Sequence, residues 1–324
     1  MALYLHHASP LAHGITYTSI SLMDIYALSV ALNSEILKTS VAVVIPTLNR
    51  HHLLAELLSD LAKQEVLPEQ VIVVDSSDEA FKIESNQMPI TVIPCTLKSA
   101  AVQRNIGIQY LEKSNSTINF VAFLDDDVRP KPSYLKHLCQ NLVENPKAVG
   151  VSGLAIAVGE KLKKPSRLLR NLKLIGAEGS LSRAAVNTPV RSTEGIIEVE
   201  WLIGCSVWRF SQVNDLRFEE DFSGQSVFED VIFSIRAARK GILLVNAQVK
   251  FDHLLAVESR PNSLEHYRSW VVNRYRLKTI SPESIDTWRF TLVNLLMLLS
   301  LAMRAHFLGA LGILLGSLEL LRKK

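Results

Sequence analysis

The sequence contains few cysteines, little net charge and no apolar run long enough to span a lipid bilayer. Its 324 residues include three cysteines, and their odd number and spacing fit neither a zinc site nor a CxxC pair. This cysteine usage is typical of a reducing compartment. The formal net charge of +3 is too small to indicate nucleic acid as a partner. Residues 1–39 lack the basic start and compact apolar run of a secretory signal, and we interpret them as an N-terminal extension.

The regular part of the sequence alternates apolar strands with helices. Residues 41–46 form a continuous apolar run, and residues 71–75 form a second one that ends in the acid Asp75. Such runs are typical of strands buried on both faces. Leucines recur at helical spacing between them, over residues 51–64, and the alternation continues to residue 145. This pattern predicts an α/β, Rossmann-like fold with a mostly parallel sheet flanked by helices.

The pattern also divides the chain into parts. Residues 40–260 are predicted to form the main domain, with one half in residues 40–130 and a second half in residues 148–260. The second half contains a basic, loop-like insertion at residues 160–191. A helical, apolar C-terminal appendage is predicted over residues 261–324.

Polar residues directly follow several of the predicted strands. Ligands of such sheets bind beyond the carboxyl ends of the strands, so we expect these side chains to gather at one edge. They are Thr47, Asn49, Arg50, Asp75, Asp78 and Asp125 to Asp127. Three adjacent aspartates repel one another unless a cation or donor groups stabilise them. Their oxygens favour a divalent metal such as Mg²⁺ or Mn²⁺, although a solvated turn is the alternative reading of these three residues alone.

Four motifs in the first half follow one another along the chain. They are residues 43–50 (VVIPTLNR), 71–78 (VIVVDSSD), 100–107 (AAVQRNIG) and 123–127 (FLDDD). In this order they resemble the inverting glycosyltransferases of family 2, which have a GT-A fold. The resemblance implies transfer of a sugar from a nucleoside-diphosphate donor to an acceptor, by metal-assisted single displacement with inversion. In its Asp-x-Asp motif, Asp125 is expected to face the ribose and Asp127 the metal.

The resemblance also implies which residues hold the donor. The set expected to bind the nucleotide sugar is Pro46, Thr47, Arg50, Asp75, Arg104 and Asp125. Asp75 is expected at the base, although Ser76 stands where many relatives carry a second aspartate. Arg104 would bind a base carbonyl or phosphate oxygens, since a guanidinium presents its donors in a fixed fork. His253 joins Asp127 as an expected metal ligand.

The acceptor side is expected from the second half of the chain. The resemblance assigns Asp230 as the general base, because a carboxylate within hydrogen-bond reach can take the proton of an attacking hydroxyl. It places Trp201, Gly204 and Glu229 beside the acceptor. From the residues alone, an acid pair in the first turn of a helix also complements the helix dipole, and Trp201 is as readily a core aromatic.

Two uncharged apolar runs, residues 290–303 and 307–318, lie near the end of the chain and are separated by Arg304 and His306. Each is shorter than the ~20 residues that a membrane-spanning helix needs. They leave open a re-entrant hairpin, a single span that includes Arg304, or helices packed against a partner. We expect this segment to associate with the membrane. The protein is then expected at the cytoplasmic face of the cell membrane, peripheral or monotopic, with a glycan or lipid-linked acceptor.

Other readings stay open at this stage. Arg274 and Arg276 are candidates to neutralise the leaving diphosphate, or to form a solvated basic face. A nucleotidyltransferase acting on sugar phosphates is an alternative activity, but it would more naturally carry a Gly-rich basic loop after the first strand. A catalytically inactive membrane scaffold is a third alternative, which the intact Asp125, Asp127 and Asp230 make less favourable.

Overall fold

A computed structural model describes residues 40–82, 88–114, 117–157, 167–192, 194–221, 227–254, 263–281 and 284–322. The predicted extension over residues 1–39 and part of the basic insertion lie outside the described residues. Contacts along the chain separate Met1–Lys38 from Thr39–Lys324, and only the second unit is described below.

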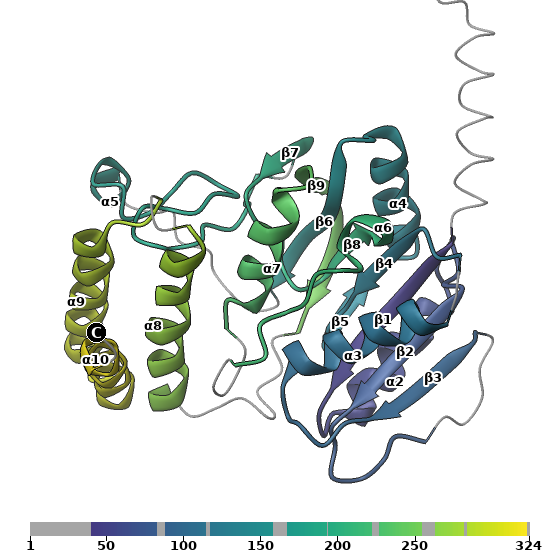
Figure 1. The fold of residues 1–324 in the computed structure, drawn as a ribbon, viewed down its shortest axis with the longest axis horizontal. Helices are drawn as coiled ribbons and strands as arrows, with labels where there is room; N and C mark the ends of the chain where they lie inside the picture. The colour runs from purple at the N-terminus through teal and green to yellow at the C-terminus, as the bar shows by residue number, and fades with distance from the viewer. Residues whose placement is uncertain are drawn as a thin grey trace, which may run out of the picture. The chain divides into compact units, whose positions relative to one another are not determined.

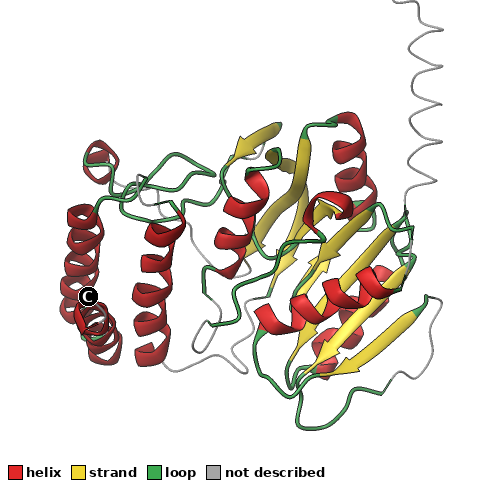
Figure 2. Ribbon diagram, viewed as in Figure 1, coloured by secondary structure: helices red, strands yellow, loops and turns green. Residues whose placement is uncertain are grey.

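A single sheet forms the centre of the fold (Figure 1; Figure 2). Within the described residues it has nine strands, in the order β3-β2-β1-β4-β8-β6-β9-β5, with β7 paired to β9. They are β1 (Val41–Thr47), β2 (Gln70–Asp75), β3 (Ile90–Pro94), β4 (Phe120–Phe123), β5 (Val128–Pro130), β6 (Ala148–Ala157), β7 (Ile196–Val199), β8 (Ser206–Arg209) and β9 (Ile242–His253).

The sheet is mixed, which corrects the prediction of a mostly parallel one. Strands β3, β2, β1 and β4 run parallel, as the first half of the sequence predicts. Strand β8 is antiparallel to both β4 and β6, while β5 and β7 are antiparallel to β9. Strands β8, β5 and β7 have only four, three and four residues. The alternation of apolar and polar residues that marks a strand is too short in them to be recognised from the sequence.

Helices cover both faces of the sheet (Figure 2). They are α2 (His51–Leu61), α3 (Ala100–Lys113), α4 (Tyr134–Glu144), α6 (Phe210–Val213) and α7 (Glu229–Ala238). The short helix α5 (Arg167–Asn171) buries none of its residues and lies near α9, away from the sheet (Figure 1). Val43 of β1 belongs to the apolar cluster that contains α2 and α4, whereas Val44 belongs to the cluster that contains α3 and α7. Because successive strand residues point to opposite faces, both faces must be apolar, which explains the continuous apolar run.

Helix α3 is held close to the ends of β1 and β2. A Cβ atom added at Gly107 would lie 2.3 Å from Cγ1 of Val44, so only glycine fits this contact without movement. One turn earlier, the buried Gln103 side chain donates hydrogen bonds to the carbonyl oxygens of Thr47 (2.8 Å) and Val74 (2.6 Å). These contacts fix the start of α3 beside the strand ends, where its next residue, Arg104, enters the site.

Three helices follow the sheet: α8 (Ser263–Ile280), α9 (Thr287–Met303) and α10 (Phe307–Arg322), which pack together (Figure 1). The chain turns between α9 and α10 at residues 304–306, so the alternative of a single span that includes Arg304 is wrong. Among the described residues, no helix combines the length and apolarity needed to cross a bilayer.

Arg274 of α8 lies inside this helical region and not at a phosphate site. Its side chain is fully buried and donates to the carbonyl oxygens of Ala184 (2.9 Å) and Ala185 (3.1 Å). It also donates to the side-chain oxygen of Asn294 in α9 at 3.1 Å. The expectation that Arg274 neutralises a leaving diphosphate is therefore wrong, because its donors hold the loop before β7 to the C-terminal helices.

Candidate functional site

The carboxyl ends of three parallel strands bring the predicted site residues to one edge of the sheet. Thr47 at the end of β1 lies in register with Asp75 at the end of β2, and Val44 lies in register with Phe123 at the end of β4. The aspartates 125–127 follow β4 directly. Pro46, expected at the nucleotide, is buried within β1 and in register with Val74.

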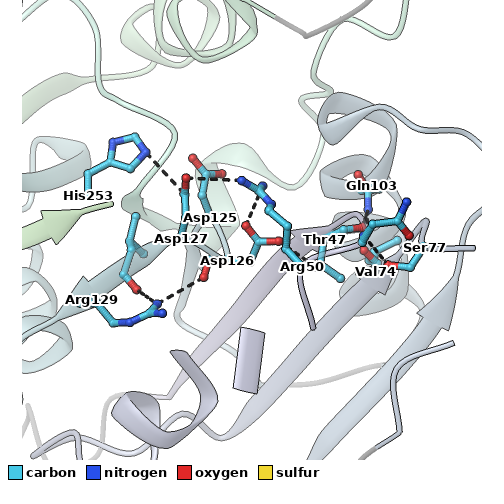
Figure 3. A network of polar contacts seen from close by, with 12 residues as sticks. Thr47, Arg50, Val74, Ser77, Gln103, Asp125, Asp126, Asp127, Arg129 and His253 are labelled. Carbon is cyan, nitrogen blue, oxygen red and sulfur yellow. Dashed lines mark hydrogen bonds and ion pairs between the residues drawn. The ribbon is translucent and has the colours of Figure 1, made fainter. Parts of the chain in front are cut away.

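Asp126 points into the protein and organises this edge of the sheet. It occupies the variable middle position of the Asp-x-Asp motif, to which the resemblance assigns no role. Its side chain is 0% exposed and accepts a hydrogen bond from the Thr47 hydroxyl at 2.7 Å. Arg50 pairs with it, with 2.6 Å between Nη2 and Oδ1 (Figure 3). Burial raises the pKa of Asp126 to about 7, although Arg50 and Thr47 act in the opposite direction. Asp126 thus ties the loop after β1 to the aspartate loop.

The neighbouring carboxylates form a candidate metal centre. One ligand atom each from Asp125, Asp127 and His253 lies within 4.8 Å of the other two. His253 Nε2 is 3.4 Å from Asp127 Oδ1 (Figure 3). His253 reaches this place because it ends β9 and pairs in register with Val128, the residue after Asp127. Two carboxylates and one imidazole are a donor set that suits Mn²⁺ or Mg²⁺, so these residues fit the expected cation.

The loops after β1 and β2 are joined to each other beside this centre. Asn49 has a left-handed backbone, with φ of 55°, and its N–H donates to Oγ of Ser77 at 2.7 Å. Its side-chain amide donates to Asp78 at 3.0 Å. Asp75 is buried and accepts from the backbone N–H groups of Ser77 and Phe81, both at 2.9 Å. In this structure Asp75 therefore orders the loop expected to meet the nucleotide base.

Arg104 connects the two halves of the domain. Its guanidinium is 2% exposed and donates to Asp125 on one side and to Glu229, the first residue of α7, on the other. Burial acts to lower the pKa of Arg104, but Glu229 and Asp125 outweigh it and hold that pKa above its usual value. Gly204 lies beside this group, since a Cβ atom there would be 3.0 Å from Nη2 of Arg104. Arg104, which was expected to bind the nucleotide, thus donates its hydrogen bonds to two carboxylates of the protein in this structure.

Asn105 extends the same connection. Its side-chain amide donates to the carbonyl oxygen of Phe218 (2.9 Å) and to Glu220 (2.7 Å), and its oxygen accepts from the N–H of Phe218 (2.8 Å). The sequence contains Asn105 in its third motif but gives no signal for this contact, because the partner lies more than a hundred residues away.

Asp230, the expected base, lies in the first turn of α7. The helix begins after Phe228, whose φ of 77° is a left-handed value that a bulky side chain rarely adopts. Burial raises the pKa of Asp230 to about 6, opposed by the N–H of Val231, which donates to its carboxylate at 2.8 Å, and by the charge of Arg104. Its carboxylate is therefore ionised at neutral pH yet more basic than that of an ordinary aspartate.

Trp201 lies between β7 and β8, on the chain that leads to Gly204. Its ring packs against the apolar cluster that α7 shares with the C-terminal helices. Its indole N–H is buried and has no hydrogen-bond partner among the described residues. A buried donor without a partner is uncommon in folded proteins.

Comparisons with known proteins agree with this geometry. Residues 42–196 match the family described as glycosyl transferase family 2. A comparison with curated protein sequences finds no significant match. Among solved structures, S. aureus TarS 1–349 in complex with UDP-GlcNAc is 18% identical with a TM-score of 0.50, covering 74% of this chain and 67% of that one.

Two further TarS structures are similar. The 1–349 fragment alone is 17% identical with a TM-score of 0.48, over 74% of this chain and 66% of that one. The longer TarS structure is 18% identical with a TM-score of 0.49, over 74% of this chain and 40% of that one, so this chain spans less than half of its length. By class, the protein is a glycosyltransferase with a GT-A fold. The similarity to glycosyl transferase family 2 lies in residues 42–196, slightly less than half of the chain.

Proposed function

We propose that this glycosyltransferase moves a sugar from a nucleoside-diphosphate donor to an acceptor hydroxyl, with inversion at the anomeric carbon. The observation that carries the proposal is the cluster of Asp125, Asp127 and His253, joined through Arg104 to the helix that holds Asp230. The buried Arg104 thus contacts the candidate metal cluster through Asp125 on one side, and the helix that carries the proposed base Asp230 through Glu229 on the other. The TarS structure with UDP-GlcNAc supports a nucleotide-sugar donor.

Asp125, Asp127 and His253 are the residues that would hold a divalent cation such as Mn²⁺ or Mg²⁺. When bound, such a cation neutralises the charge that develops on the departing diphosphate. Arg50 lies 3.4 Å from Asp127 and 2.6 Å from the neighbouring Asp126, and its charge reduces the repulsion between these two carboxylates. The nucleoside of the donor then binds against the loops that follow β1 and β2, next to Asp75.

In the proposed step, the acceptor oxygen attacks the anomeric carbon while Asp230 accepts its proton. The bond between the anomeric carbon and the diphosphate oxygen breaks, and its electron pair leaves with the nucleoside diphosphate. The raised pKa of Asp230, about 6, suits this task, since a base is most effective when its pKa lies near the working pH. Trp201, Gly204 and Glu229 are proposed to line the acceptor side, for a glycan or lipid-linked acceptor.

A donor screen tests the proposal. The purified protein is incubated with Mn²⁺ and UDP-, GDP- or dTDP-sugars, and released nucleotides are separated by chromatography. We expect metal-dependent release of a nucleoside diphosphate from one donor class. This release is lost in Asp127→Asn and kept in the control Glu65→Gln, which changes an exposed carboxylate outside the site. Release of pyrophosphate would favour a nucleotidyltransferase instead. Donor binding without turnover on any acceptor pool would favour an inactive scaffold.

A further inference from the structure

Helix α10 presents glycines to the protein and leucines to the outside. Gly309, Gly312 and Gly316 are buried against α8. A Cβ atom added at Gly312 would lie 2.4 Å from the carbonyl oxygen of Leu264, and one at Gly316 would lie 2.9 Å from that of Arg268. The two helices therefore approach each other closely enough at these glycines for the backbone of α8 to contact that of α10.

The outward faces of α9 and α10 carry large apolar side chains. Those on α10 and its start are exposed by 38–70%: Phe307, Leu308, Leu311, Leu314, Leu315, Leu318 and Leu321. Helix α9 adds Trp288, Leu295, Leu296, Leu299 and Met303, exposed by 40–82%. Of the eighteen exposed large apolar side chains among the described residues, these are twelve. So dense a patch does not belong to an ordinary water-facing surface.

Polar groups lie on the inner side of this bundle. Asn294 of α9 is buried, accepts a hydrogen bond from Arg274, and lies 3.5 Å from the Ser317 hydroxyl of α10. Arg268 of α8 pairs with Glu319 of α10 at 2.8 Å. A helix of a water-soluble bundle turns leucines inward and polar groups outward. Here most of the leucines of α10 face outward, while Asn294 lies inside with apolar residues such as Phe290, Leu301 and Ile313. Small residues and interhelical polar contacts are typical of helices that pack in lipid.

Exposed cations stand at the edges of the leucine face. Arg304 precedes α10 and Arg322 ends it, and both side chains are exposed. On another side, Arg289 at the start of α9 donates to the carbonyl oxygen of Leu172 at 2.9 Å. This contact places the end of α5, with the exposed Arg170, beside α9. An apolar face with cations at its margin complements an anionic lipid surface.

We propose that the outer face of α9 and α10 lies in the interfacial region of an anionic lipid bilayer, with the helix axes roughly in the membrane plane. Helix α10 has 16 residues, or about 24 Å at 1.5 Å per residue, which is short of the ~30 Å hydrocarbon core. Insertion with the α9–α10 turn leading would carry Arg304 into hydrocarbon, whereas an in-plane helix leaves Arg304 and Arg322 at the headgroups. The docking does not depend on the proposed sugar transfer.

Vesicle flotation of the full-length protein tests this proposal. Vesicles are made from phosphatidylcholine, with or without phosphatidylglycerol. We expect the protein to float with the anionic vesicles, and the double variant Leu311→Glu/Leu318→Glu to bind on the order of 10²-fold less. The matched control Leu67→Glu/Ile196→Glu places two charges at apolar positions elsewhere that are at least as exposed, and is expected to bind as the original protein does.

A second variant separates the charge contribution and leaves the leucine face unchanged. Arg304→Gln/Arg322→Gln is expected to lower binding to anionic vesicles about tenfold and to leave binding to neutral vesicles unchanged. Circular dichroism and thermal unfolding check that each variant is folded. The proposal is overturned if the unaltered protein stays unbound, or if Leu311→Glu/Leu318→Glu floats as the unaltered protein does. It is also overturned if the protein is a dimer without lipid and Leu311→Glu/Leu318→Glu makes it monomeric, since a second copy then covers the face.

Discussion

The buried contact between Arg104 and Glu229 allows a quantitative test of how the two halves of the domain are joined. Glu229 is 6% exposed and Arg104 is 2% exposed, so neither charge is well solvated when its partner is removed. Removing one member of a buried ion pair costs about 3–5 kcal/mol of folding free energy, because the other charge stays buried without compensation. For Arg104→Gln we expect the lower end of this range, since the side chain of Asp125 is 29% exposed and regains water.

The double variant Arg104→Gln/Glu229→Gln distinguishes pairing from packing. It replaces both buried charges by amides that can hydrogen-bond to each other, so no uncompensated charge remains at this contact. We expect it to be more stable than Arg104→Gln alone, with a coupling free energy of about 2 kcal/mol between the two positions. If each side chain acted through its own packing, the two single effects would add.

Urea unfolding followed by tryptophan fluorescence measures this cycle. The dependence of unfolding free energy on urea should be equal among the variants, so that the midpoints report stability. Lys136 and Glu65 form the control pair, because both side chains are exposed and their ion pair of 2.7 Å is open to solvent. We expect no measurable coupling for Lys136→Gln/Glu65→Gln. Additive effects of Arg104→Gln and Glu229→Gln would refute the reasoning.

Three further predictions concern the donor site, the base and the core. Asp127→Ala should abolish Mn²⁺-dependent donor binding in calorimetry, and unchanged metal-dependent affinity would contradict the assignment. Asp230→Asn should keep donor binding but slow transfer by ~10²–10⁴-fold. The transfer rate of the unaltered protein should rise as the pH passes about 6, because only the ionised carboxylate accepts a proton. If Asp230→Asn shows the same rise, another residue is the base. Gly107→Ala should lower unfolding free energy by about 1–3 kcal/mol, because its Cβ meets Val44, and Val44→Ala should restore part of it.

The first half of the fold was predictable because its strands are buried on both faces. The runs that became β1 and β2 are apolar throughout residues 41–46 and 71–74, and α2 has leucines at helical spacing. Strand β8 was not predictable in the same way. It has four residues and follows a turn, and its place between β4 and β6 depends on pairing with residues far along the chain.

The site divides in a similar manner. Asp125, Asp127 and His253 were predicted because their motifs resemble a family, and the structure brings them together. The inward direction of Asp126 depends on Thr47 and Arg50, whose positions follow only from the parallel register of β1 and β4. Contacts between residues distant in sequence leave no local pattern, so such partnerships emerge only from the fold.

The left-handed Phe228 has a practical consequence for anyone seeking a water-soluble catalytic fragment. Its ring is buried in one cluster with Val271 of α8, Phe290 of α9 and Ile313 of α10, two positions before Asp230. Cutting the chain ahead of α9 would remove two of these neighbours and leave an unusual backbone angle without the packing that stabilises it. Such a fragment would lose the exposed apolar surface of α9 and α10, but it would also lose the packing that positions the proposed base Asp230. Solubility is better gained by exchanging outward leucines such as Leu311 for polar residues, with every helix kept in place.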